Sequence, residues 1–99
     1  MADDSIQLGG NIELSGFSKL DSGVMIILKK IIGNYARKMS DISKNFENLS
    51  LRIKTVHDNK YEIHAKLIDN GRAIASSAVE HNIFVAVDSS LKKIMHELK

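Results

Sequence analysis

The chain has 99 residues, of which 43% are hydrophobic and 26% charged, a composition typical of one soluble globular domain with a single core. It contains no cysteine, so disulfides and thiolate chemistry are excluded. Lysine and arginine together number 14 against 12 aspartate and glutamate residues, which gives a formal net charge of +2. Because this balance is only mildly basic, any binding of nucleic acid has to depend on where the charges lie.

The N-terminal segment, residues 1–10, shows little periodicity, and we expect it to be a flexible lead-in to a single domain over residues 11–99. Its acidic start lacks the basic residues and apolar run of a signal peptide. The longest apolar stretch near it, residues 24–28, is too short to span a bilayer. The sequence therefore predicts a cytoplasmic protein that does not associate with a membrane.

The first predicted elements are a short strand and a long helix. Apolar and polar residues alternate over residues 12–16, which is the period of a half-buried strand. Asp21 or Ser22 is expected to cap the helix. Gly33 falls inside this helix at a cost of about 1 kcal/mol relative to alanine, and the one reason that the sequence suggests is a close approach by a partner. The expected apolar face consists of Val24, Ile27, Leu28, Ile31, Tyr35, Met39 and Ile42.

Two alternating runs, residues 49–55 and 61–67, predict the next two strands. A two-residue turn between them would set Ile53 opposite His64, and apolar and polar residues would then share one face of the sheet. The connection is therefore expected to contain three residues, 57–59, with Asn59 in a left-handed conformation.

The last strand and the second helix complete the chain. Asn70 and Gly71 are the preferred pair for a type I′ hairpin, which aligns Leu67 with Ile74 across the two strands. Asn82 is expected to cap the final helix. The apolar face of that helix is expected to contain Ile83, Val87, Leu91, Ile94, Met95 and Leu98.

The predicted order of elements is β-α-β-β-β-α, with the fourth strand over residues 72–79. A crossover through a helix makes the first two strands parallel, whereas the hairpins make the remaining pairs antiparallel. The predicted fold is therefore α+β, a two-layer sandwich with a mixed four-stranded sheet and two helices on one face.

Basic residues collect on the sides of the two predicted helices that point away from the sheet. Clustered lysines and arginines bind phosphates and release the counterions of a nucleic acid. Charge alone nevertheless favours a solvated helix face, since lysine is a common means of keeping helices soluble. The residues of this surface are Lys29, Lys30, Arg37, Lys44, Lys92 and Lys93, with Asp41 and Glu97 near its flanks.

Four histidines and many serines raise the question of a metal site or an enzyme, but their spacing argues against both. His81 and His96 are 15 residues apart, and no histidine pair has the i, i+4 spacing of a helical zinc site. No glycine-rich phosphate loop follows a strand, and no nucleophile elbow is present. Tyr35, Tyr61 and Phe84 fall on predicted core faces, which argues against a base-stacking platform. The sequence predicts a protein that is not an enzyme and has no metal, cofactor or small-molecule substrate.

Three stretches of the second half, residues 61–66, 70–78 and 83–94, combine a strand rich in alanine and serine with a basic amphipathic helix. Phe84, Ala86 and Asp88 form an aromatic-x-Ala-aliphatic-Asp step at the start of that helix. This pattern resembles the ribosome hibernation-promoting factors, also called ribosome-associated inhibitors. The resemblance extends over about residues 11–98. Because the further C-terminal domain of long members is absent, the chain resembles their short form.

The resemblance implies a β-α-β-β-β-α domain that lies on the small ribosomal subunit, where mRNA and tRNA would bind, and keeps idle ribosomes inactive under stress. In that family the basic faces of the two helices meet ribosomal RNA. This implies binding roles for Arg37, Lys38, Lys92 and Lys93, whereas Lys29, Lys30 and Lys44 are supported by the helical wheel alone. The implied function is translation inhibition by steric exclusion of mRNA or tRNA.

The alternative is a protein-interaction or homo-oligomerisation module without RNA binding, in which an edge strand or the open sheet face mediates assembly. The salt dependence of the association distinguishes the two hypotheses. Binding to phosphates weakens steeply as the salt concentration rises, whereas the affinity of an apolar interface barely changes. Free double-stranded RNA is a less favoured ligand, since the final helix lacks a lysine-rich N-terminus.

Overall fold

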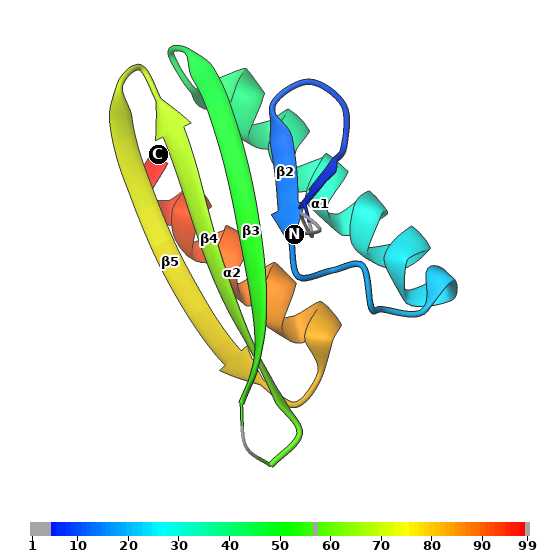
Figure 1. Ribbon diagram of the computed structural model, residues 1–99. Coiled ribbons are helices and arrows are strands. Elements are labelled where there is room, and N and C mark those ends of the chain that lie inside the picture. Colours follow the sequence, from blue (N-terminus) through cyan, green and yellow to red (C-terminus); the bar gives the residue numbers. More distant parts are fainter. Residues whose placement is uncertain (1–4, 57, 99) are drawn as a thin grey trace.

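Two helices cover one face of a five-stranded mixed sheet in the computed structural model, which describes residues 5–56 and 58–98 (Figure 1). This arrangement confirms the predicted α+β class and its two layers. None of the helices within these two ranges combines the length and the hydrophobicity that crossing a membrane requires. In chain order the elements are β1 (Ser5–Gln7), β2 (Ile12–Ser15), α1 (Ser22–Ile42), β3 (Phe46–Val56), β4 (Lys60–Asp69), β5 (Arg72–Glu80) and α2 (Ile83–Leu98).

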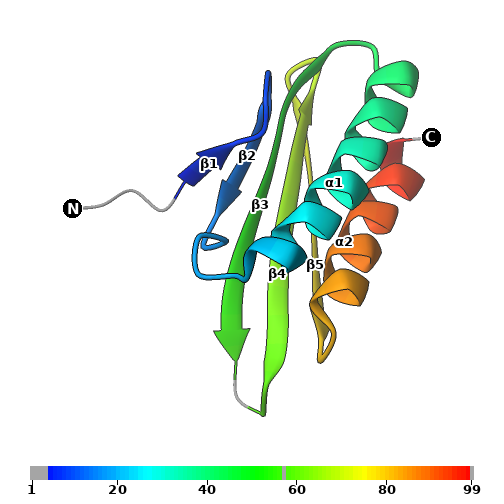
Figure 2. The ribbon, with the colours of Figure 1, turned by 90° about the vertical axis from the view of Figure 1, so that its right-hand side faces the viewer.

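The strands lie in the sheet in the order in which they follow one another in the chain, β1-β2-β3-β4-β5. As the sequence predicts, β2 and β3 are parallel and are connected through α1, and the later pairs are antiparallel hairpins. Both helices lie on the same side of the sheet, and the far end of the β3–β4 hairpin projects beyond them (Figure 2). No helix of the described residues lies on the other face of the sheet.

The sheet has one strand more than the four that the sequence predicts. The additional strand, β1, comes from the segment expected to be a lead-in and pairs antiparallel with β2, so that Ser5 lies opposite Ser15. The Ser5 hydroxyl donates a hydrogen bond to Glu13 Oε2 at 3.1 Å, and Ile6 packs against the core. A strand of three residues with one large apolar side chain is too short for alternation to reveal it.

The connection between β3 and β4 has the predicted length. The strands end and resume at residues 56 and 60, and Ile53 pairs with Ile63, so apolar side chains share the helix-facing side. Asp58 and Asn59 have φ angles of 67° and 59°, which confirms the left-handed conformation expected at Asn59. His57 lies outside the described residues.

The hairpin between β4 and β5 also forms as predicted. Asn70 and Gly71 have φ angles of 52° and 81°, as the two central residues of a type I′ turn require. Leu67 pairs with Ile74, which places both side chains in the core. Each hairpin thus keeps the apolar side chains of its two strands on one face of the sheet.

The helix α1 begins at the predicted cap, but its buried face differs from the predicted one. The Asp21 carboxylate accepts a hydrogen bond from the Gly23 amide at 3.1 Å. Ile27 and Ile42 were expected in the apolar face and are 48% and 45% exposed. The prediction was wrong here because isoleucines occur on nearly every side of this helix, so periodicity alone does not locate its centre. The residues that are buried are Met25, Leu28, Ile32, Ala36 and Met39.

The helix α2 begins as expected, because the Asn82 side-chain oxygen accepts hydrogen bonds from the amides of Phe84 at 2.8 Å and Val85 at 3.3 Å. Ser90 is fully buried at the contact with the sheet. Its hydroxyl donates to the Val87 carbonyl at 2.9 Å, and its carbonyl accepts from the Ser76 hydroxyl at 2.6 Å. The bond from Ser76 connects β5 to α2, whereas the bond to Val87 satisfies the buried hydroxyl within the helix.

The turn after β2 depends on a glycine. Gly16 has a φ of +80°, and a Cβ added there would lie 2.7 Å from both Cγ2 and the carbonyl oxygen of Ile53. A side chain at this position would be unfavourable for two reasons, because the positive φ strains residues other than glycine and because the Cβ would clash with Ile53. The turn leads directly into Phe17, which is fully buried in the core.

Candidate nucleic-acid interface

All seven residues that the sequence analysis assigned to RNA binding are exposed. Four belong to α1, two to α2, and one lies in the loop that follows α1. Asp41 is the single acidic residue in the sequence of α1, so this helix carries an excess of positive charge. The seven residues are Lys29, Lys30, Arg37, Lys38, Lys44, Lys92 and Lys93.

Tyr35 marks the side of α1 that faces α2, because its hydroxyl donates a hydrogen bond to Asp88 Oδ1 at 2.7 Å. Successive helical residues are about 100° apart, so Gly33 and Arg37 lie about 200° around the helix from Tyr35. They therefore occupy the side of α1 that points away from α2.

Lys29 and Lys30 lie on the same side, because they precede Gly33 by four and three residues and are thus its neighbours one turn earlier. We call the surface formed by Lys29, Lys30, Gly33 and Arg37 the α1 flank. It gathers three of the seven predicted residues on one helix.

Two further predicted residues lie at the contact between the helices. The Lys38 ammonium is 5.8 Å from the centroid of the Tyr35 ring, and the Lys92 ammonium is 3.8 Å from Asp88 Oδ2. Burial raises the pKa of Tyr35 to about 12, and the hydrogen bond to Asp88 and the charge of that carboxylate act in the same direction. Tyr35 and Asp88 thus connect α1 to α2 between two cations, while Asp88 offsets part of their charge.

Lys93 lies on the opposite side of α2 from this contact. Its ammonium donates a hydrogen bond to the Ser77 carbonyl at 2.6 Å, at the edge of β5 that no strand covers. The structure therefore places Lys93 beside the sheet edge and not beside α1. It remains exposed, so its charge is accessible to a ligand approaching from that side.

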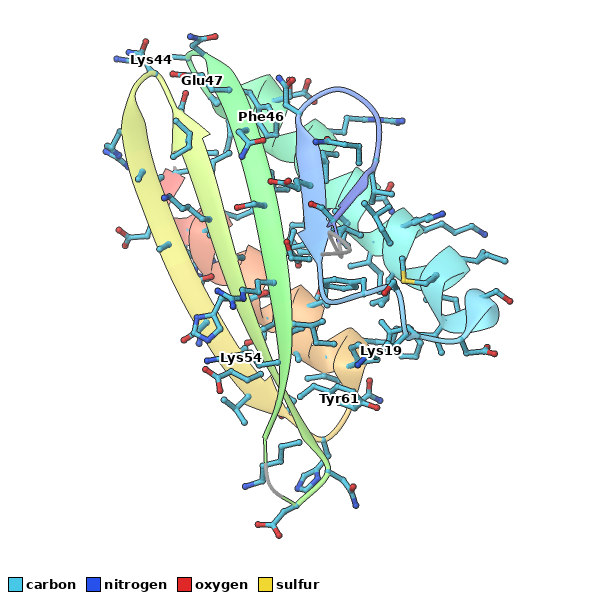
Figure 3. The ribbon with its side chains drawn as sticks, in the orientation of Figure 1. Lys19, Lys44, Phe46, Glu47, Lys54 and Tyr61 are labelled. Carbon is cyan, nitrogen blue, oxygen red and sulfur yellow. The ribbon has the colours of Figure 1, made fainter. Side chains whose placement is uncertain are left out.

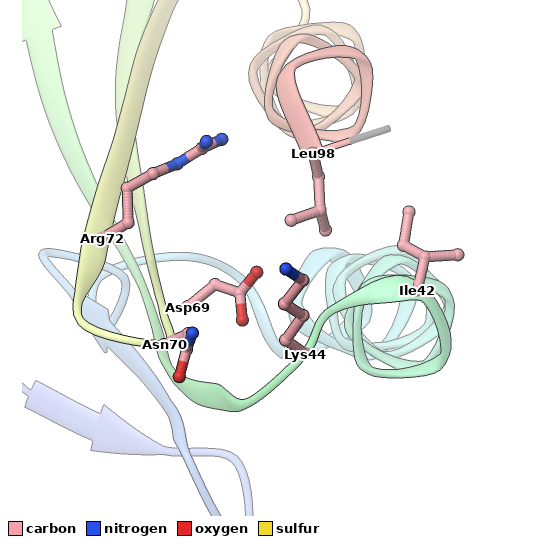
Figure 4. A pocket seen from close by; sticks show the side chains of 6 residues that line it. All are labelled: Ile42, Lys44, Asp69, Asn70, Arg72 and Leu98. Atoms are coloured by element: carbon pink, nitrogen blue, oxygen red, sulfur yellow. The ribbon is translucent and has the colours of Figure 1, made fainter.

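Lys44 lies at the end of the molecule where β4 turns into β5 (Figure 3). It lines a cavity of about 330 Å³ together with residues from the ends of both helices and from the turn (Figure 4). The Asn45 amide donates to Asp69 Oδ1 at 2.9 Å, which ties the loop after α1 to the end of β4. The lining residues are Ile42, Lys44, Asp69, Asn70, Arg72 and Leu98.

The open face of the sheet carries a second polar surface, which the sequence analysis did not assign to RNA binding. A shallow cavity of about 340 Å³ crosses several strands there, and it includes Arg52, His64 and Lys66. Arg52 pairs with His64 across β3 and β4, and the His64 ring contacts the Glu62 carboxylate. The alternation of each strand placed these side chains on the open face, but the order of the strands was needed to bring them next to Glu13 on β2.

Within residues 5–56 and 58–98, no three histidine, cysteine, aspartate or glutamate side chains gather in an arrangement that could hold a metal ion. The seven predicted basic residues are distributed over several parts of the molecule. They divide into the α1 flank, the pair at the helix contact, Lys93 at the sheet edge and Lys44 at the end cavity.

Comparisons with known proteins find one similar fold that extends over nearly the whole domain. No family model matches the sequence, and no curated protein matches it. Among solved structures, the chain is similar to a ribosomal subunit interface protein from Coxiella burnetii, with a TM-score of 0.58 and 12% sequence identity. The similarity covers 89% of this chain and 90% of that one. At this identity the match shows a shared fold, and it confirms the fold that the resemblance implies.

Proposed function

We propose that this protein is a ribosome-associated factor of the hibernation-promoting kind, which binds RNA of the small subunit and prevents mRNA or tRNA from occupying the same place. The observation that carries the proposal is the similarity of nearly the whole domain to a ribosomal subunit interface protein. The sequence pattern around Phe84, Ala86 and Asp88 supports the same family independently of the fold.

The proposed mechanism is steric and needs no chemical step. Exposed lysines and arginines on two helices bind phosphates, and the helices hold these charges in a fixed arrangement because the core and the bond between Tyr35 and Asp88 anchor both of them. The domain measures 38 × 26 × 24 Å, so a strand of RNA cannot pass through the space it occupies. Affinity would come from the phosphates and inhibition from the volume of the domain.

The test is sedimentation of the tagged full chain with purified ribosomes on sucrose gradients at low and high salt. Comigration with the small subunit or the intact ribosome is expected at low salt and should be lost at high salt. A protein that remains at the top of the gradient at both salt concentrations would contradict the proposal and favour the interaction-module alternative.

Charge reversal then identifies the face that binds. Arg37→Glu combined with Lys92→Glu is expected to abolish comigration while circular dichroism stays unchanged, because both side chains are exposed on the helical layer. Lys19→Glu combined with Lys54→Glu makes the same change in net charge at residues outside the two helices (Figure 3), and it should leave comigration largely intact. Equal losses from the two double variants would show that net charge, and not this face, governs association.

A further inference from the structure

Gly33 lies in the middle of α1, where the fold gives no reason for a glycine. The helix continues without interruption from Ser22 to Ile42, and Gly33 has ordinary helical backbone angles. A Cβ built at Gly33 would meet no side chain or neighbouring element within 4 Å. This contrasts with Gly16, where positive φ and the close Ile53 carbonyl exclude a side chain. An alanine at position 33 would therefore fit the isolated protein without strain.

Glycine is also an unfavourable residue inside a helix, second only to proline, because it loses the most backbone entropy on folding. The folded chain alone would thus be more stable with alanine at position 33. The contacts of the fold therefore do not account for glycine at this position. A glycine does allow a ligand or another backbone to come closer to the helix than a methyl group would.

The charges around Gly33 indicate what kind of partner approaches. The neighbours of Gly33 on the helix surface lie three and four residues away in each direction. Three of the four are basic, Lys29, Lys30 and Arg37, and the fourth, Ala36, is buried. All three side chains are exposed, and none forms an ion pair within the described part of the chain. An open patch of backbone flanked by three cations is complementary to a narrow anionic chain, and RNA presents such a chain in its phosphates.

We infer that Gly33 is the point on α1 where the RNA backbone comes closest, with a phosphate held between Lys29, Lys30 and Arg37. This inference rests on the proposed function, since it specifies how one helix would engage ribosomal RNA. The amides of a continuous helix are already hydrogen-bonded within the helix, so the glycine provides space and the three side chains provide the bonds. A methyl group at position 33 would keep the phosphate away from all three cations at once.

The decisive variant is Gly33→Ala, because the inference predicts opposite signs for stability and binding. The melting temperature should rise by a few degrees, since alanine is the better helix former. Association with purified ribosomes, measured by titration at fixed salt, should weaken by about tenfold, as expected when a charge-assisted contact is pushed apart. A glycine needed for folding would give a lower melting temperature instead, and that result would overturn the inference.

Asn34→Ala is the matched control. It also replaces a poor helix former by alanine at an exposed position of the same turn. Unlike Gly33→Ala, it places no additional methyl group above the backbone of Gly33. It should raise the melting temperature and leave association unchanged. If the native chain binds ribosomes and Gly33→Ala binds equally well, the inference fails while the proposed function stands. If the native chain does not bind ribosomes, the proposed function fails and the inference with it.

A photo-crosslinking amino acid in place of Asn34 identifies the class of the partner. Irradiation of the complex with ribosomes should attach the chain to ribosomal RNA. Attachment to an acidic ribosomal protein, with no RNA product, would overturn the assignment of the occupant.

Discussion

Gly16 shows how strongly one missing side chain can determine the path of the backbone. Gly16→Ala should lower the free energy of unfolding by about 2 kcal/mol or more, because it combines the cost of a left-handed conformation with a clash in a packed region. The clash is with Ile53, whose Cγ2 and carbonyl oxygen would both lie 2.7 Å from the new methyl group. Urea denaturation of the two proteins measures the difference.

Gly9 provides the control for this prediction. It has a similar positive φ of +66°, but a Cβ there would meet nothing within 4 Å. Gly9→Ala should therefore cost only the conformational part, about 1 kcal/mol. Losses of equal size at Gly9 and Gly16 would show that contact with Ile53 contributes nothing.

The raised pKa of Tyr35 leads us to expect that the folded protein loses stability in alkaline solution. Its pKa is raised from 10.0 to about 12 in the folded protein, by burial first and then by Asp88. The unfolded chain therefore releases this proton at lower pH than the folded one. The stabilisation is complete below about pH 10 and is lost as the pH rises towards 12.

Comparison with Tyr35→Phe isolates this effect from the titration of other groups. The variant should lose about 1 kcal/mol at neutral pH, because the hydrogen bond to Asp88 is gone. The difference in unfolding free energy between the native chain and the variant should shrink as the pH rises from about 10 towards 12. Parallel pH profiles for the two proteins would argue that Tyr35 ionises as it does in an unfolded chain.

At the scale of elements, the start of α2 depends on the side chain of Asn82. Its oxygen accepts hydrogen bonds from two amides of the first turn, which would otherwise lack partners. Asn82→Ala should lower the free energy of unfolding by about 1 kcal/mol, and Asn82→Ser should retain most of the stability. Thermal unfolding of the three proteins tests the order, and an Asn82→Ser variant as unstable as Asn82→Ala would contradict a capping role.

The sequence predicted the strands and hairpins of the second half well, because their patterns leave few alternatives. A shift of one residue between β3 and β4 would have exposed Ile53 or Ile63, and Asn70-Gly71 admits one preferred turn. The strand β1 was missed because three residues are too few to show a period. The face of α1 was misplaced because its isoleucines occur on several sides, and Ile26 and Ile27 stay exposed.

The candidate site was predicted residue by residue but not as an arrangement. Helical spacing identifies Lys29, Lys30 and Arg37 as neighbours without further information. It does not show which side of each helix faces the other, and that depends on long-range contacts such as the bond between Tyr35 and Asp88. For the same reason, nothing in the sequence indicated that Lys93 would bind the Ser77 carbonyl at the edge of β5.

At the scale of the whole molecule, the order of strands in the sheet has a consequence for folding. The elements β3, β4, β5 and α2 follow one another in the chain and pack against one another, joined by short turns. The strand β2 reaches its partner β3 only across α1, a segment of 21 residues. Contacts between near neighbours in the chain cost less loop-closure entropy, so the unit over residues 46–98 should form first and β2 should dock late.

The same order governs how the native protein opens. Hydrogen exchange of backbone amides should be slowest in β3 and β4 at the centre of the sheet and fastest in β1 and β2, with α1 between them. Equal protection of β2 and β4 would contradict this order. The N-terminal edge would then be the part of the domain that unfolds and refolds without disturbing the rest, and mutations there should change the rate of unfolding more than the rate of folding.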